Sequence, residues 1–177
     1  MNKIYYHPVS RSLHWIMFIL IAVALALIEV RGEIPKGNPL RDSLKSWHML
    51  AGQLVFLFVI VRVLARLRFS APPALPGGRW QTAGAHAMHG LLYLIMFALP
   101  ISGVVFYQAA GKEVEFLGWI LPQLVAPDPV LKGNIKEIHE TMGNVVYFLV
   151  GIHVLGALYH HFIVKDDTLK RMLSGKA

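Results

Sequence analysis

The sequence predicts an all-α integral membrane protein, a four-helix bundle in which the chain runs up, down, up and down. The chain is 55% hydrophobic and only 15% charged, with a mean hydropathy of +0.52, which is too apolar for an ordinary soluble domain. Four apolar stretches also reach the length of about 20 residues that a helix needs to cross a bilayer. We therefore expect residues 1–177 to form one membrane domain.

The elements follow from the apolar stretches and the polar segments between them. The predicted helices cover about residues 13–30, 47–65, 89–107 and 139–164. Ser46 is the expected cap of the second helix. The segment 70–79 is rich in proline and glycine and is expected to be a loop. The longer segment 108–136 is expected on the outer side, and its apolar part, 116–121, is too short to span and suits the interface.

The basic residues predict the orientation. The chain has 17 Lys and Arg against 10 Asp and Glu, a formal net charge of +7. With the N-terminus inside, ten basic residues fall on the inner side and seven on the outer side, which follows the positive-inside rule moderately well. We therefore expect both termini to be cytoplasmic and the first helix to be retained rather than cleaved. Nucleic acid is excluded as a partner, because membrane topology accounts for these positions.

Four histidines occupy matching depths in this bundle. His139 and His153 are fourteen residues apart, so an α-helix places them within about 40° of one face and about 21 Å apart in depth. His14 lies at the inner end of the first helix, and His48 lies at the outer end of the second. The up-down-up-down order therefore pairs His14 with His153 and His48 with His139.

Two imidazoles at one depth on facing helices are the axial ligands that a six-coordinate haem iron requires. Gly52 and Gly143 each follow one of these histidines by four residues, and they leave the helix face clear for a flat macrocycle. The chain has no cysteine, so iron–sulfur clusters and covalent haem attachment are excluded. We predict two non-covalent haems in the bundle core, each with its iron held by one histidine pair.

The same residues also fit two alternatives. Small residues such as Gly52 and Gly143 allow simple helix–helix packing. Histidine binds zinc, copper and nickel as well, so a histidine-based metal transporter is the rival class of protein. A transporter is expected to carry carboxylates or broken helices near mid-membrane, whereas the cores of the first, second and fourth helices have no acidic residue.

Further histidines gather near the predicted inner surface. His86 and His89 lie three residues apart at the start of the third helix, and His160 follows His153 by seven on the same helix face. Interfacial packing alone would account for them. The functional alternative is a pocket beside the inner haem that hydrogen-bonds a quinone carbonyl and supplies protons during its reduction, with Arg79 assisting.

Several stretches together resemble the bacterial cytochrome b-561 family, small di-haem b-type membrane cytochromes, over essentially the full length. These stretches are Ser12-Leu-His-Trp15, Ala85-His-Ala-Met-His89, Ile138-His-Glu-Thr-Met-Gly-Asn-Val-Val-Tyr147 and Leu158-Tyr-His-His161, which leads into residues 165–172. The resemblance implies a four-helix, multi-pass protein in the lipid of the bacterial inner (plasma) membrane. It also implies two haem b groups, with His14 and His153 on the inner iron and His48 and His139 on the outer iron.

The resemblance further implies electron exchange with the quinone pool. Some members are described as superoxide oxidases that pass an electron from periplasmic superoxide to ubiquinone, so the expected activity is that of a superoxide:quinone oxidoreductase. Superoxide is an anion, and basic side chains near the outer mouth would raise its capture rate. The candidates are Lys36, Lys45, Lys132 and Lys136. The alternative is a non-catalytic cytochrome b subunit that relays electrons from a periplasmic partner, which docks on segment 108–136, to quinone.

Overall fold

The computed structural model describes residues 5–75 and 78–173 of the 177-residue chain. Four long helices account for most of it: α1 (Pro8–Glu33), α2 (Pro39–Arg68), α3 (Arg79–Ala109) and α4 (Pro129–Tyr159). A π-helical turn, η1 (His160–Val164), continues α4, and a short helix, α5 (Lys170–Leu173), follows. Between α3 and α4 the strands β1 (Glu115–Phe116) and β2 (Trp119–Ile120) pair antiparallel.

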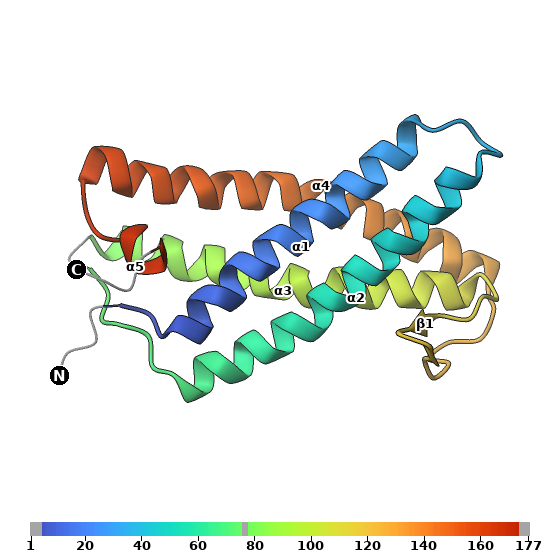
Figure 1. Cartoon of the computed structure of the whole chain (residues 1–177), viewed down its shortest axis with the longest axis horizontal. Coiled ribbons are helices and arrows are strands. Elements are labelled where there is room, and N and C mark those ends of the chain that lie inside the picture. Colours follow the sequence, from blue (N-terminus) through green and yellow to red (C-terminus); the bar gives the residue numbers. More distant parts are fainter. Residues whose placement is uncertain (1–4, 76–77, 174–177) are drawn as a thin grey trace.

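The four long helices form an up-down-up-down bundle, which confirms the predicted all-α architecture. The hairpin of α1 and α2 lies obliquely across the hairpin of α3 and α4, and α1 begins at the end of the molecule where α4 finishes (Figure 1). Helix α1 packs along α2, α3 packs along α4, and α2 also contacts α3. All four helices are long and apolar enough to cross a membrane, so the chain is a multi-pass membrane protein.

The long helices begin earlier than the sequence predicts, at residues 8, 39, 79 and 129 instead of about 13, 47, 89 and 139. The apolar stretch marks only the part of a helix that lies in hydrocarbon, whereas the helix itself continues into the polar interface. Helices α1, α2 and α4 start with a proline at the first turn, where its missing N–H costs no hydrogen bond.

Polar side chains cap these early starts. The Asn38 side chain accepts from the Leu40 N–H, and the Asp128 carboxylate accepts from the N–H groups of Val130 and Leu131. The prediction that Ser46 caps the second helix is wrong, because the helix starts seven residues earlier, at Pro39, and the Ser46 hydroxyl donates to the Asp42 carbonyl inside it.

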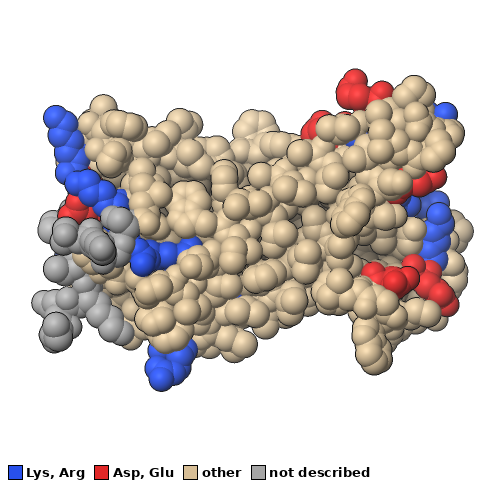
Figure 2. All heavy atoms as spheres, viewed as in Figure 1, with Lys and Arg blue, Asp and Glu red and all other residues tan. Residues whose placement is uncertain are grey.

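The buried core is small and lies between α1, α2 and α3. Met17, Val55 and Val59 form its centre, with Tyr93 and Phe97 of α3 packed against it. Many other large apolar side chains are exposed, as lipid-facing side chains are. Figure 2 shows a broad band without charged side chains on one face, between charged ends, and the acidic side chains gather at the end that holds the α1–α2 connection.

Interhelical hydrogen bonds supplement this packing. Lipid tails are as apolar as the side chains, so helix association in a membrane rests on close contact and on hydrogen bonds that contribute about 0.6–2 kcal/mol each. The Arg62 guanidinium of α2 donates to the Ser10 carbonyl of α1 at 3.0 Å. The Trp15 indole of α1 donates to the Met172 carbonyl of α5, also at 3.0 Å, and so holds the C-terminal segment against the first helix.

The segment between α3 and α4 is folded. Gln108, at the end of α3, donates from its side-chain amide to the Pro122 carbonyl and accepts from the Leu124 N–H. Leu117 and Gly118 form the turn of the hairpin with φ of +50° and +87°, a left-handed conformation that suits Gly118 and is unusual for leucine. Most of the apolar stretch 116–121 therefore lies in a hairpin, with Leu117 in its turn and the exposed Trp119 side chain on β2.

Candidate haem-binding site

The outer histidine pair joins α2 to α4. The ring centroids of His48 and His139 lie 6.3 Å apart, with the ring planes at 84° to each other. His48 Nδ1 lies 2.8 Å from the carbonyl oxygen of Ala24 in α1. A carbonyl only accepts, so Nδ1 carries the proton and the Nε2 lone pair is free for a metal. Metal-binding histidines generally fix their tautomer through such a contact.

Two residues of α3, Leu99 and Ser102, hold His139 in the same tautomer. Its Nδ1 lies 3.1 Å from the Leu99 carbonyl oxygen and 2.9 Å from Ser102 Oγ, and the Ser102 hydroxyl donates to the same carbonyl. Gly103 makes room for the ring, because a Cβ added there would lie 3.2 Å from His139 Cε1. The sequence does not predict these partners, because hydropathy does not reveal which face α3 turns toward α4.

The inner pair joins α1 to α4. The ring centroids of His14 and His153 lie 6.1 Å apart, with the planes at 70°. Arg62 of α2 places its Nη2 atom 3.3 Å from His14 Nδ1. Arginine only donates, so this contact requires an unprotonated Nδ1, which leaves the proton of the neutral ring on Nε2. The inner pair therefore has the spacing of the outer pair, but His14 has the opposite tautomer to His48 and His139.

Both spacings fit a haem iron. With metal–nitrogen bonds of about 2 Å and ring centroids about 1.1 Å beyond the nitrogens, two imidazoles on opposite sides of one metal ion have centroids about 6 Å apart. The helix faces beside the ligands also fit a flat group. A Cβ added at Gly52 or Gly143 would meet none of the described residues within 4 Å, so neither glycine serves close helix packing there.

The predicted quinone residues lie toward the end of the bundle where α3 begins and α4 finishes, but they are not all together. The His89 ring lies 5.6 Å from the His153 ring. His160 contacts Asp166, with 2.6 Å between His160 Nδ1 and Asp166 Oδ2. His86 is exposed on α3, and Arg79 is its first residue.

Two cavities in the described part of the chain lie elsewhere. One of about 350 Å³ opens between α1 and α4, where the Tyr147 hydroxyl donates to the Glu29 carboxylate at 2.8 Å. A small one of about 20 Å³ lies at the inner end, with Arg62 and Arg66 among its lining residues. The described residues that line these two cavities include none of the predicted quinone residues.

The predicted superoxide-steering lysines have different surroundings. Lys45 Nζ lies 4.5 Å from the centroid of the Tyr107 ring, and Lys112, which was not among the predicted residues, approaches the same ring at 5.5 Å. Lys136 forms an ion pair with Glu140 at 2.6 Å, so its charge is partly neutralised. Lys36 and Lys132 are exposed, in the α1–α2 connection and in the first turn of α4 respectively.

Comparison with known proteins identifies the family of this chain. Residues 5–175 match the family described as prokaryotic cytochrome b561. Cytochrome b561 homolog 1 of Escherichia coli strain K12 is 38% identical over 162 residues, which cover 91% of this chain and 92% of that protein. The probable superoxide oxidase CybB of Yersinia pestis is 32% identical over 172 residues, 97% of each chain.

A third relative, cytochrome b561 homolog 2 of Escherichia coli strain K12, is 32% identical over 170 residues, which cover 95% of this chain and 90% of the relative. These matches set aside the metal-transporter alternative. The chain belongs to the prokaryotic cytochrome b561 family, and is accordingly a haem b membrane protein of electron transfer.

Proposed function

We propose that this protein carries electrons across the bacterial inner membrane through two haem b groups, from periplasmic superoxide to ubiquinone. The observation that carries the proposal is the presence of two histidine pairs, each with the centroid spacing of a six-coordinate haem iron. When bound, each haem supplies a one-electron redox centre. The protein supplies the ligands, the apolar surroundings and the spacing between the two centres.

In this proposal His48 and His139 ligate the outer iron, and His14 and His153 ligate the inner iron. Helix α4 contributes one ligand to each pair, fourteen residues apart, and this offset amounts to about 21 Å along the helix axis. The hydrocarbon core of a bilayer is about 30 Å thick, so the two centres lie toward opposite leaflets. Gly52 and Gly143 leave the space beside the outer ligands open.

On the outer side, basic residues attract the superoxide anion. The name of the Yersinia pestis relative supports this substrate. Acidic side chains gather at the same end of the molecule, so the attraction is local rather than a property of the whole face (Figure 2). Lys45, together with Lys112 beside Tyr107, and the exposed Lys36 and Lys132 contribute most, whereas Lys136 contributes less because of Glu140.

On the inner side, ubiquinone takes up the electrons. Two superoxide ions release two O₂ and two electrons, and one quinone takes these electrons and two protons from the inner water to become the quinol. The imidazoles of His86, His89 and His160 are the groups suited to hydrogen-bond the quinone and supply the protons, with Arg79 nearby. Both termini are cytoplasmic in this orientation, which the excess of basic residues on that side favours.

A spectrum tests the ligand assignment. We expect a reduced-minus-oxidised difference spectrum of the purified protein to show two haems per chain, and the His153→Ala variant to retain about one. The exposed His86 provides the matched control, and His86→Ala should keep both haems. Retention of both haems by His153→Ala would refute the assignment.

Superoxide should also reduce the bound haem, and ubiquinone should reverse this reduction. Reduction no faster than in a haem-free control would exclude the enzymatic activity.

The second candidate function is that of a cytochrome b subunit that relays electrons from a periplasmic protein. One feature favours it: Leu117, Trp119 and Ile120 of the β-hairpin are 66%, 79% and 64% exposed at the end of the bundle. An exposed aromatic and aliphatic tip is typical of a docking surface. A soluble partner that co-purifies with the wild type, but not with a Trp119→Ser variant, would favour this function over superoxide oxidation.

A further inference from the structure

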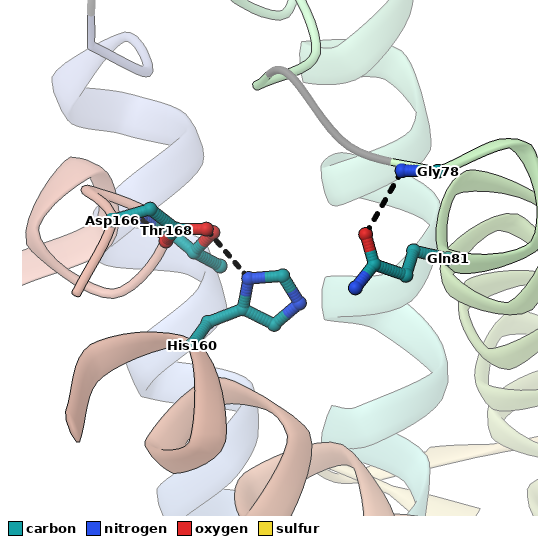
Figure 3. Close-up of polar contacts among 5 residues, drawn as sticks. All are labelled: Gly78, Gln81, His160, Asp166 and Thr168. Atoms are coloured by element: carbon teal, nitrogen blue, oxygen red, sulfur yellow. Dashed lines mark hydrogen bonds and ion pairs between the residues drawn. The ribbon is translucent and has the colours of Figure 1, made fainter. Parts of the chain in front are cut away.

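Helix α4 ends in a turn that folds the chain back onto His160. The π-helical turn η1 is followed by Lys165 in the left-handed conformation, with φ of +60°. The reversal lets the Asp166 N–H donate to the His160 carbonyl at 3.1 Å. It also brings Asp166 Oδ2 to 2.6 Å from His160 Nδ1 (Figure 3). Irregular π turns of this kind occur often at functional sites.

The Asp166 carboxylate is held on both of its oxygens. Oδ1 accepts from the Thr168 N–H at 2.8 Å, and Oδ2 faces His160. Burial raises the pKa of Asp166, but the hydrogen bonds from Thr168 and His160 outweigh this and hold the pKa below its ordinary value. The side chain is 18% exposed, and Asp166 is therefore a fixed, ionised acceptor.

This acceptor determines what the other ring nitrogen does. An ionised carboxylate only accepts, so the proton of the neutral imidazole lies on Nδ1 and the Nε2 atom is free. In Figure 3 the Nε2 edge of His160 points toward the side chain of Gln81, at the start of α3. The dyad of His160 and Asp166 thus directs one exchangeable nitrogen toward the space between the end of α4 and the beginning of α3.

We propose that Asp166 is a positioning residue that makes His160 a proton donor for quinone reduction at the inner end of the bundle; this inference rests on the proposed function. His160, when protonated on both nitrogens, gives its Nε2 proton to a quinone oxygen that has accepted an electron. One N–H bond breaks and one O–H bond forms. The neutral ring keeps its proton on Nδ1, where it donates a hydrogen bond to Asp166. The Nε2 atom then takes a new proton from the inner water.

The neighbouring charged residues Asp167 and Arg171 are engaged with partners other than His160. Its neighbour Asp167 is half-exposed and forms an ion pair with Lys170 at 3.1 Å. Arg171 is engaged with the Pro73 carbonyl at 2.8 Å. Asp167 is adjacent to Asp166 and has the same side chain, but its carboxylate pairs with Lys170, whereas that of Asp166 pairs with His160. Asp167 therefore offers a matched control.

The test compares Asp166→Asn with Asp167→Asn in haem-loaded protein reconstituted in vesicles. The haem is reduced, mixed with a short-chain ubiquinone, and its reoxidation is followed over a range of pH. We expect Asp166→Asn to slow reoxidation by about 10- to 100-fold and to change its pH profile. Asp167→Asn should behave as the wild type. Superoxide-driven reduction of the haem, at the far end, should be unchanged in both variants.

A double-mutant cycle separates positioning from a merely structural role. If Asp166 acts through His160, the variant with both Asp166→Asn and His160→Gln should reoxidise no more slowly than His160→Gln alone. Additive effects, or a pH profile unchanged by Asp166→Asn, would overturn the inference while leaving the proposed function intact. If ubiquinone fails to reoxidise the wild-type haem, the proposed function falls, and this inference falls with it.

Discussion

The two histidine pairs differ in the hydrogen-bond partners of their Nδ1 atoms. In the outer pair both Nδ1 atoms face backbone carbonyl oxygens, of Ala24 and Leu99, so each Nε2 already presents a lone pair to a metal. In the inner pair His14 Nδ1 faces the guanidinium of Arg62. An iron held through Nε2 would leave the ring proton on Nδ1, and Arg62 would then have to leave that contact, because arginine has no acceptor. The outer site is therefore pre-organised and the inner one is not.

This difference predicts unequal haem affinities. His153→Ala leaves only the outer pair, and His48→Ala leaves only the inner pair. We expect haem to bind His153→Ala about tenfold more tightly than His48→Ala, because second-shell partners of metal ligands typically change affinity by that order. Titration of each apo-protein with haem, followed by absorbance, measures the two constants. Equal affinities, or tighter binding at the inner site, would contradict the prediction.

Gly103 offers a second test at this scale. A methyl group there would lie 3.2 Å from His139 Cε1, so the ring must shift by a few tenths of an ångström and weaken its bond to Leu99. We expect Gly103→Ala to lower the occupancy of the outer haem and leave the inner haem in place. Gly84→Ala on the same helix, where a Cβ meets none of the described residues within 4 Å, is the control. A haem content and electron paramagnetic resonance spectrum that are the same in both variants would refute this role.

Among the elements, the turn after α4 links fold stability to pH. Asp166 has a lowered pKa in the folded protein, so its contribution to stability is fully present above the ordinary carboxyl value of 3.8. The contribution disappears as the pH falls below that value, toward the pKa of the folded state. We expect the wild type to lose thermal stability over this range more steeply than Asp166→Asn. Parallel melting curves of the two proteins, recorded at a series of pH values, would show that the turn contributes nothing.

The helices show how far hydropathy predicts this fold. It finds the four crossings and their order, because the bilayer fixes the length of an apolar span. It misplaces the helix starts, because caps such as Asn38 and Asp128 lie in the interface. Helical residues there are polar, so hydropathy does not distinguish them from a loop. Rotation about each helix axis is also hidden, since lipid-facing and core-facing sides are both apolar. The contacts of Ser102 and Gly103 could not be predicted for that reason. The contact of Asp166 depends on the reversal of the chain after α4, which hydropathy does not reveal.

Arg62 was not predicted to be a site residue, although its position within an apolar helix marks it in the sequence as a functional candidate. An arginine within a membrane helix is costly and is a functional candidate by default. Arg62 lies at the depth of His14, on a neighbouring helix, and the structure joins the two side chains. The histidine spacing was more informative, because fourteen residues on one helix fix both the face and the depth of His139 and His153. The structure accordingly brings each of them beside the partner that the sequence suggests.

At the scale of the whole molecule, the orientation can be measured directly. The chain contains no cysteine, so single cysteine variants give an unambiguous background. In intact spheroplasts we expect a membrane-impermeant thiol reagent to label Lys36→Cys, in the α1–α2 connection, and to leave Lys170→Cys, in α5, unlabelled until the membrane is opened. The reverse pattern would place the termini outside and would exchange the inner and outer assignments of the two histidine pairs.

The division of the bundle into two hairpins has a consequence for how the protein matures. Each histidine pair takes one member from the α1–α2 hairpin, His14 or His48, and the other from α4. A nascent chain can thus insert the two hairpins one after the other and pack α2 against α3, while the bonds through iron between the hairpins await delivery of the cofactor. In cells short of haem the inserted polypeptide would lack these bonds, and membrane proteases would remove it more readily. The supply of the prosthetic group, rather than synthesis of the chain, would then set the abundance of this protein.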